Sequence, residues 1–293
     1  MDNLPDEFKQ RKTPLRIDLV LDGGLFNGSY LVGALYFLKE LERRKYIRVD
    51  RISGASVGSI VGLAYLSDSL DSMSDLYNIV YNEMKNSNTM SCIQDLKNKL
   101  KYDTDLYNKL NNKLYVSYNN IDKRTKKTKY LYKTNDEVFD AISKSCHLPF
   151  VIDGKLLYKN KYLDGVNPYM FKPCPNKKIL YLDLFGYDKL INFFSIKNEK
   201  TNYHRILSGM LDIHNFYIKQ SDTQMCSYVN DWGMINRSRL SIKGLYETII
   251  VYTVCILNIL SRYTMGIEKT ILYKLFARIV KECFGVVLET YCM

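Results

Sequence analysis

The chain has 293 residues, of which 46% are hydrophobic and 25% are charged. These proportions are ordinary for a globular protein, and they exclude a collagen-like, coiled-coil or mostly disordered chain. At about 150 residues per domain, the length allows one large domain or two small ones. There are 42 Lys and Arg against 31 Asp and Glu. The net charge of +11 suits an anionic partner, either nucleic acid or an anionic membrane surface.

The seven cysteines are odd in number and scattered, with neither a CxxC pair nor the Cys/His spacing of a zinc site. We therefore expect a reducing, intracellular compartment and no metal. Residues 1–14 are a polar leader that lacks the apolar region of a signal peptide, so we expect no signal peptide.

The first elements alternate between strand and helix. Residues Leu15–Leu21 have the alternation and β-branched content of a strand, and a helical spacing of leucines begins after Ser29. Residues Ile47–Ser53 indicate a second strand, and Val57–Leu66 a second helix. This order within about 50 residues predicts a mostly parallel sheet covered by helices.

Residues 91–135 are strongly basic, with 11 Lys and Arg against 4 Asp and Glu. Two strand-like runs, Lys113–Tyr118 and Lys129–Lys133, flank a basic turn at residues 122–128. The basic excess of residues 91–135 suits anionic lipid headgroups, and a solvated hairpin tip is an equally good interpretation.

The second half of the chain is predicted to hold a helix over Asp136–Lys144, a strand over Lys178–Leu184, and apolar helices after about residue 240. The run Ile249–Leu260 is shorter than the 18 or so residues that span a bilayer. It is typical of a core-packed helix and also of an interfacial anchor, and Ile271–Leu288 has the same ambiguity.

The segment Gly54-Ala55-Ser56-Val57-Gly58 is a G-x-S-x-G motif between a predicted strand and a predicted helix. A nucleophilic serine needs a sharp turn that raises its hydroxyl above the sheet, and small neighbours that let strand and helix close together. The alternative is a tight strand–helix turn without chemistry. The context favours Ser56 as a nucleophile.

The segment from Asp22 to Gly28 (DGGLFNG) precedes the first helix. It lacks the third residue of a dinucleotide fingerprint and the G-K-[ST] ending of a phosphate loop, so no cofactor is expected. Backbone amides in such a loop can hold an oxyanion. The candidates are Gly23, Gly24, Leu25, Phe26 and Gly28. A glycine-rich connection without a ligand is the other interpretation.

The third segment is Tyr162-Leu163-Asp164-Gly165-Val166-Asn167-Pro168. A serine nucleophile needs a general base, and Asp164 before Gly165 at a strand end can serve, although an ordinary Asp-Gly turn has the same sequence. The chain has three histidines. His147 is typical of a structural residue, while His204 or His214 could be the base of an esterase of the α/β-hydrolase type.

The three segments, in this order over residues 15–230, resemble those of a patatin-like phospholipase. The resemblance implies a three-layer α/β fold, with a central mostly parallel sheet flanked by helices and a helical C-terminal extension. The implied organisation is a leader at 1–14, a patatin-like domain at 15–240 and the extension at 241–293.

By position, Ser56 then resembles the nucleophile, Asp164 the base of a two-residue catalytic centre, and the Gly23–Gly28 loop the oxyanion hole. The implied reaction is hydrolysis of phospholipid acyl esters, of phospholipase A or lysophospholipase type, at a membrane surface and without a cofactor or metal. Three positions depart from the family pattern, and they are Leu25, Asn27 and Val166. These departures leave a lipid-binding pseudoenzyme as an alternative, whereas nucleic-acid binding has no recognised motif to support it.

Overall fold

The computed structural model describes residues 13–24, 27–73, 91–100, 103–150, 153–184 and 203–263, together with residues 5, 274, 275, 278, 279 and 282. The strands are β1 (Leu15–Leu21), β2 (Ile47–Ala55), β3 (Leu114–Asn120), β4 (Thr125–Lys129), β5 (Tyr162–Asp164), β6 (Lys178–Leu182) and β7 (Cys226–Tyr228). The α-helices are α2 (Gly28–Arg43), α3 (Val57–Leu66), α5 (Ser91–Leu100), α6 (Leu106–Leu110), α7 (Asn135–Ser145), α9 (Tyr203–Lys219) and α10 (Met234–Tyr263). Short 3-10 turns cover Leu70–Met73 and Val229–Asp231.

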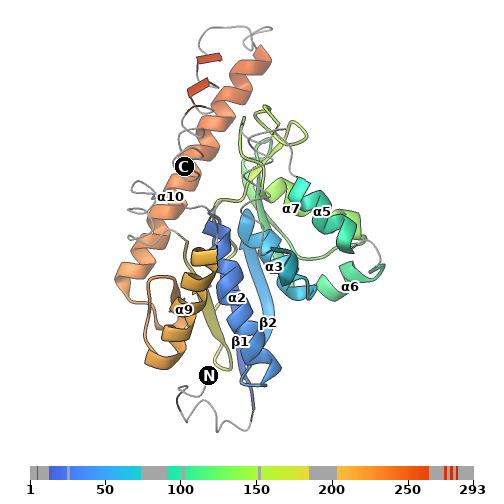
Figure 1. Cartoon of the computed structure of the whole chain (residues 1–293). Coiled ribbons are helices and arrows are strands. Elements are labelled where there is room, and N and C mark those ends of the chain that lie inside the picture. The colour runs from blue at the N-terminus through green and yellow to red at the C-terminus, as the bar shows by residue number, and fades with distance from the viewer. Residues whose placement is uncertain are drawn as a thin grey trace.

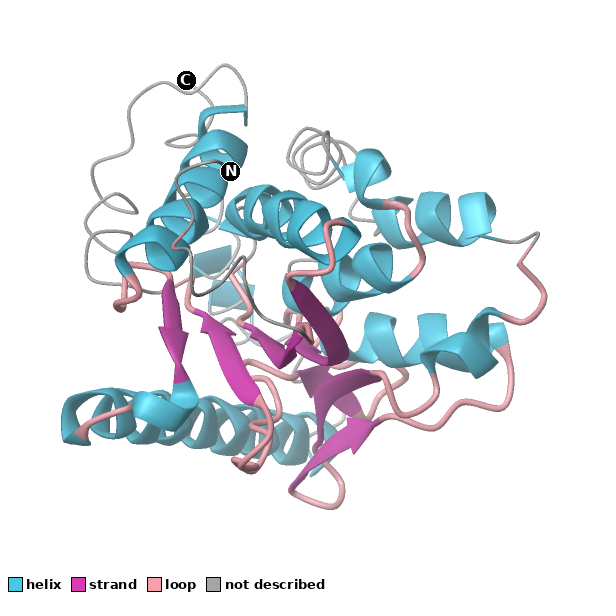
Figure 2. Ribbon diagram, turned by 90° about the horizontal axis from the view of Figure 1, so that it is seen from below, coloured by secondary structure: helices cyan, strands magenta, loops and turns pink. Residues whose placement is uncertain are grey.

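The strands form one mixed sheet in the order β4-β3-β2-β1-β6-β7, with β5 also paired to β3. The central pairs β1–β2, β1–β6 and β2–β3 are parallel, while β4, β5 and β7 are antiparallel to their neighbours. Helices lie on both sides of the sheet (Figure 2). The predicted α/β class and mostly parallel sheet are therefore confirmed.

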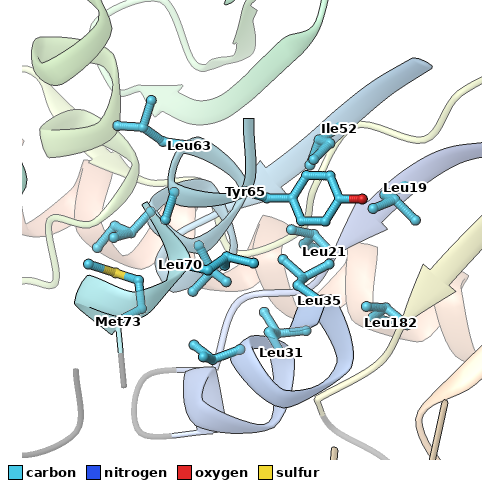
Figure 3. Packing of buried hydrophobic residues seen from close by; sticks show 14 of the residues in the cluster. Leu19, Leu21, Leu31, Leu35, Ile52, Leu63, Tyr65, Leu70, Met73 and Leu182 are labelled. Carbon is cyan, nitrogen blue, oxygen red and sulfur yellow. The ribbon is translucent and has the colours of Figure 1, made fainter. Parts of the chain in front are cut away.

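Strand β1 divides the core between the two faces of the sheet. Its residues Ile17, Leu19 and Leu21 face the main cluster, which they share with α2 and α3. Figure 3 shows the part of this cluster around Tyr65. Val20 points the other way, into a smaller cluster with Trp232. This alternation follows from the two-residue period of a strand, and it places Asp22, the residue after β1, on the side of Val20.

One predicted strand is displaced. The second basic strand was expected at Lys129–Lys133, but the structure places β4 at Thr125–Lys129, inside the predicted basic turn. Because β4 pairs with β3 from Val116↔Lys129 to Asn120↔Thr125, the turn is short. Lys126 and Lys127 become strand residues, whereas Lys123 and Arg124 remain in the turn. Cross-strand pairing with β3 outweighs the low strand propensity of a Lys-rich segment.

Helix α10 is longer than the apolar run Ile249–Leu260, and it begins before the expected boundary at residue 240. In Figure 1 it is the long orange helix that continues beyond the globular body. Its residues Val254 and Cys255 pack against Ile121. By length and composition alone, Met234–Leu260 could cross a membrane, the one such helix in the part of the chain that the structure describes. The expected helix over Ile271–Leu288 falls largely outside the described residues.

Candidate active site

The chain turns sharply at Ser56, between the end of β2 and the start of α3. Ser56 has φ 50° and ψ −129°, a backbone conformation that L-residues rarely adopt. Gly54 and Gly58 make the turn possible. A Cβ on Gly54 would lie 2.5 Å from the Gly58 carbonyl oxygen, and one on Gly58 would lie 2.6 Å from the carbonyl oxygen of Leu21. The glycines of the motif are therefore required by the close approach of strand and helix.

Two serine hydroxyl groups form hydrogen bonds to the backbone of this turn. The Ser56 N–H donates to Ser145 Oγ at 2.9 Å, and Ser145 Oγ donates to the Ser117 carbonyl at 2.6 Å. The Ser59 hydroxyl donates to the Ser56 carbonyl at 2.7 Å. Both backbone polar groups of the buried Ser56 are thus satisfied, which leaves its side-chain hydroxyl for other chemistry.

The register of β3 brings Asp164 to the same place. On one edge of β3, Ala55 of β2 lies opposite Ser117, and Asp164 of β5 lies opposite the next residue, Tyr118. Strand β4 occupies the other edge over these residues, so β2 and β5 share an edge and meet end to end. Residues far apart in the sequence therefore become neighbours.

The Asp164 carboxyl is buried and only partly hydrogen-bonded. Oδ1 accepts the Val166 N–H at 2.7 Å, whereas Oδ2 has no hydrogen-bond partner among the described residues. Burial raises the pKa of Asp164 to about 7, against the opposing effects of the Val166 N–H and the Ser56 hydroxyl. A carboxyl with a pKa near neutral and one oxygen free of hydrogen bonds has the properties of a general base.

The Ser56 hydroxyl is close enough to Asp164 to favour the charged carboxylate. No hydrogen bond within 3.5 Å joins the two side chains, however, and this agrees with the unpaired Oδ2. Such contacts are often long in a free enzyme and shorten when substrate binds.

The glycine loop completes the arrangement. A Cβ on Gly23 would lie 3.3 Å from Ser56 Cβ and 3.1 Å from the Val166 carbonyl oxygen, so the loop touches both other motifs. Gly24 lies against Leu184, and Gly28 lies against Val57. The two remaining candidates for the oxyanion hole, Leu25 and Phe26, fall outside the described residues.

The sequence of the chain matches a known protein family. The sequence model of the family described as "Patatin-like phospholipase" matches residues 19–170, which contain all three motifs. The chain belongs to the patatin-like phospholipase family. Membership implies a lipid substrate and lipid acyl hydrolysis in general. No curated protein matches the chain.

One departure from the patatin-like pattern has a neighbour that the sequence did not reveal. Asn27, which stands where the family often has a basic residue, donates through Nδ2 to the Leu184 carbonyl at 3.3 Å. Its Oδ1 accepts from Nη1 of Arg205 on α9, also at 3.3 Å. The Arg205 side chain is buried, and it brings a positive charge to the end of the glycine loop from another element.

The three histidines have other surroundings. His147 is buried, its carbonyl accepts the Asp164 N–H at 3.1 Å, and burial lowers the pKa of its imidazole. His214 packs edge-on against Phe37, between α9 and α2. His204 is exposed at the start of α9. Asp164 is thus the titratable group that the fold places beside Ser56.

Helix α10 contributes two charged residues that were not predicted, and both lie outside the matched family region. Lys243 Nζ lies 2.7 Å from Oδ2 of Asp22, the residue that begins the glycine loop. The Glu247 carboxylate accepts hydrogen bonds from the side chains of Asn119 and Asn167, beside the aspartate motif. Their spacing of four positions places both on one face of α10, but it does not indicate which residues that face contacts.

Proposed function

We propose that the protein is a phospholipid acyl hydrolase of the phospholipase A or lysophospholipase type, with Ser56 as nucleophile and Asp164 as general base. The Ser56 hydroxyl gives its proton to Asp164 and attacks the ester carbonyl carbon. Backbone amides of the Gly23–Gly28 loop hold the oxyanion, at about 3 kcal/mol for one such donor. The proton passes to the leaving alcohol, and an acyl ester forms on Ser56.

In deacylation, water takes the place of Ser56 as the nucleophile, and Asp164 is again the general base. Asp164 takes a proton from water, and the resulting hydroxide attacks the acyl-serine carbonyl. Collapse of the second tetrahedral intermediate breaks the bond to Ser56 Oγ, which recovers the proton, and releases the fatty acid. The chemistry uses only a hydroxyl, a carboxylate, backbone amides and water.

The observation that carries the proposal is the meeting of β2 and β5 on one edge of β3. This register places Asp164 next to the turn at Ser56, with Gly23 in contact distance. The surroundings of His214 favour the two-residue centre over a serine–histidine esterase. The turn at Ser56 and the raised pKa of Asp164 support catalysis over a binding-only protein.

The test is fatty-acid release from a panel of defined phospholipids and lysophospholipids by the wild type and by Ser56→Ala and Asp164→Asn. We expect both variants to lose at least about a thousandfold in rate, as single losses from a nucleophile–base pair do. A variant with both His204→Gln and His214→Gln is the control, and it should retain the wild-type rate. Release by Ser56→Ala at the wild-type rate contradicts the assignment.

We also propose a membrane surface containing anionic lipid as the partner that presents the substrate. The side of α10 turned away from the domain, here called the outer face, is exposed and apolar. It includes Leu245, Tyr246, Ile249, Tyr252 and Ile256. An apolar patch of this kind is typical of a contact surface.

The basic turn lies beside the same helix and supplies the charge complementarity. Lys126 pairs with Glu247 of α10, and Ile121 packs against Cys255. Lys123, Arg124 and Lys127 are exposed around it. Each Lys or Arg near an anionic lipid surface contributes about 1 kcal/mol.

The outer face can be tested by vesicle flotation. The variant Leu245→Ser/Ile249→Ser should float less than the wild type with phosphatidylserine-containing vesicles, while keeping its activity on a soluble ester. Unchanged flotation, or a loss of self-association in place of vesicle binding, contradicts the lipid surface. The second result would instead assign the outer face to contact between copies of the chain.

A further inference from the structure

Helix α10 reaches two of the three motifs from a single turn. Lys243 and Glu247 lie four positions apart and therefore on the same face of the helix. Both are turned toward the domain, with Glu247 buried and Lys243 largely so. They are charged residues in an apolar helix, and each has partners in a different catalytic motif.

Lys243 forms a salt bridge with Asp22 at the start of the glycine loop. Its ammonium group donates to Asp22 Oδ2 at 2.7 Å, to Asp183 Oδ1 at 2.8 Å and to the Tyr181 hydroxyl at 3.0 Å. The other oxygen of Asp22, Oδ1, accepts the N–H of Gly23 at 3.1 Å. The Asp22 carboxylate therefore links Lys243 to the first amide of the loop.

The charge of Lys243 is needed because Asp22 is completely buried. Burial raises the pKa of Asp22 above its usual value, and Asp183 adds to this, while Lys243 acts in the opposite direction. Burial would lower the pKa of Lys243, but the two carboxylates raise it. Without Lys243, a buried carboxylate would be left unpaired, and it would take up a proton or leave its position.

Glu247 is connected to the aspartate motif by hydrogen bonds. Nδ2 of Asn119 donates to the Asp164 carbonyl at 2.9 Å and to Glu247 Oε1 at 3.0 Å, so one amide bridges the helix and Asp164. Nδ2 of Asn167 donates to Glu247 Oε2 at 2.9 Å. Lys126 donates to the same Oε2 at 2.8 Å and completes the ring of donors.

We propose that Lys243 and Glu247 are positioning residues for the reaction at Ser56. Lys243 holds the glycine loop through Asp22, and Glu247 holds Asp164 through Asn119 and Asn167. These two residues of α10 thereby support the catalytic centre, although the helix follows the matched family region. The inference rests on the proposed function, since it concerns the same serine and aspartate.

The charges around Asp164 affect the pH dependence of activity, which would not change if Glu247 had a purely structural role. The groups that face it are Ser56, Glu247 of α10 and Lys126 of β4, and the backbone of His147 lies behind it. Glu247 raises the pKa of Asp164, and Lys126 lowers it. Removing the Glu247 charge should therefore lower the pH at which activity appears, and removing the Lys126 charge should raise it.

The experiment uses the full chain and a soluble aryl ester, so that membrane binding does not enter. It compares Lys243→Met, Lys243→Arg, Glu247→Gln and Lys126→Gln with Thr248→Ala, an exposed neighbour on the same helix. Rates are expressed per Ser56 that reacts with a fluorophosphonate probe. Melting temperature and the pH dependence of kcat/KM are measured alongside.

We expect kcat to fall by about tenfold to a hundredfold in Lys243→Met, as misplaced catalytic groups do, with a smaller change in KM. Lys243→Arg, which keeps the charge, should recover part of the rate. Glu247→Gln and Lys126→Gln should move the pH profile in opposite directions. Thr248→Ala should behave like the wild type.

Wild-type kcat per labelled serine and an unmoved pH profile in folded Lys243→Met and Glu247→Gln would overturn the inference. If Lys243→Met does not fold, the inference is tested by the pH profile of Glu247→Gln and by the rate of Lys243→Arg. A wild type that neither reacts with the probe nor hydrolyses ester contradicts the proposed function itself, and the positioning role with it. The two failures are therefore distinguishable.

Discussion

Ser145 Oγ lies 2.9 Å from the backbone nitrogen of Ser56, across 89 positions of sequence. Ser145 is the last residue of α7, and its hydroxyl also donates to the Ser117 carbonyl on β3. One buried hydroxyl thus links the turn at Ser56, the strand that aligns β2 with β5, and the helix beneath them. The strained turn is held by the tertiary structure as well as by its own glycines.

Replacing Ser145 by Ala should loosen this turn. The change removes the hydrogen bonds that Ser145 makes to the buried N–H of Ser56 and to the Ser117 carbonyl, so the free energy of unfolding should fall by about 1–3 kcal/mol. We expect kcat to fall as well, because the Ser56 hydroxyl loses its fixed position. Urea denaturation and ester hydrolysis measure the two effects. The control is Ser241→Ala, whose exposed hydroxyl donates to the Arg237 carbonyl of the same helix, and it should change neither.

The glycines of the G-x-S-x-G motif can be tested against a glycine that has room. In Gly58→Ala, the new methyl group would lie 2.6 Å and 2.7 Å from the carbonyl oxygens of Leu21 and Asp22. Such overpacking costs about 1–3 kcal/mol. It should displace the turn at Ser56 and so lower both stability and activity. In Gly244→Ala nothing lies within 4 Å, so the helix should gain about 1 kcal/mol. Equal melting temperatures for the two variants would contradict this account.

The sequence was sufficient for the parts of the site that are local. Ser56 and the glycine loop each sit in a strand–turn–helix pattern, and neighbouring parallel strands bring such turns to one edge of the sheet. Asp164 was recognised from its motif, but its position next to Ser56 depends on the register of β5 on β3, which no local pattern specifies.

The supporting residues were not predictable in the same way. Lys243 is 221 positions from Asp22, and nothing near either residue indicates the other. Arg205 looks like an ordinary surface arginine in the sequence, yet it is buried against the glycine loop. The shift of β4 has a similar cause, because pairing with β3, and not the composition of the Lys-rich segment, sets where that strand begins.

The activity should depend on pH through Asp164. As a general base, its carboxyl must be ionised, and its pKa is raised to about 7 by burial. We therefore expect kcat/KM for a soluble ester to rise with pH, with a midpoint near 7, and to level off above it. A profile recorded between about pH 5 and about pH 9 checks this. A midpoint near 4, the ordinary value for Asp, would show that the active carboxylate is not held in this environment.

Stability should depend on pH with the opposite sign. The pKa of Asp164 is higher in the folded chain than its ordinary 3.8, so the folded state binds the proton more tightly. The stability that the protonated Asp164 contributes is fully present below about pH 4 and is lost as the pH rises to about 7. Asp164→Asn lacks this titration and should be the more stable protein above pH 7, by at most about 4 kcal/mol for a pKa difference of about 3.

Urea denaturation of both proteins across the same pH range measures the difference. Other buried carboxyls, such as Asp22, titrate in both proteins and cancel in the comparison. A difference between the two proteins that does not change with pH would contradict the raised pKa.

Binding to anionic membranes should depend on the tip of the β3–β4 hairpin. Lys123 and Arg124 in the turn, and Lys127 on the adjoining strand β4, are exposed, whereas Lys126 is held by Glu247 and is left unchanged. Replacing the three by Gln should weaken binding to phosphatidylserine-containing vesicles by about 3 kcal/mol at low salt, and the loss should shrink as salt is added. Binding to neutral phosphatidylcholine vesicles should change little, because the outer face of α10 is intact.

A matched control removes the same number of charges elsewhere. Arg43, Lys45 and Arg48 lie at the end of α2 and the start of β2, and all three are exposed. Their replacement by Gln changes the net charge equally, but it should leave vesicle binding close to the wild-type value. If both triple variants lose binding to the same extent, the attraction comes from the net charge of the whole protein, and the hairpin has no particular role.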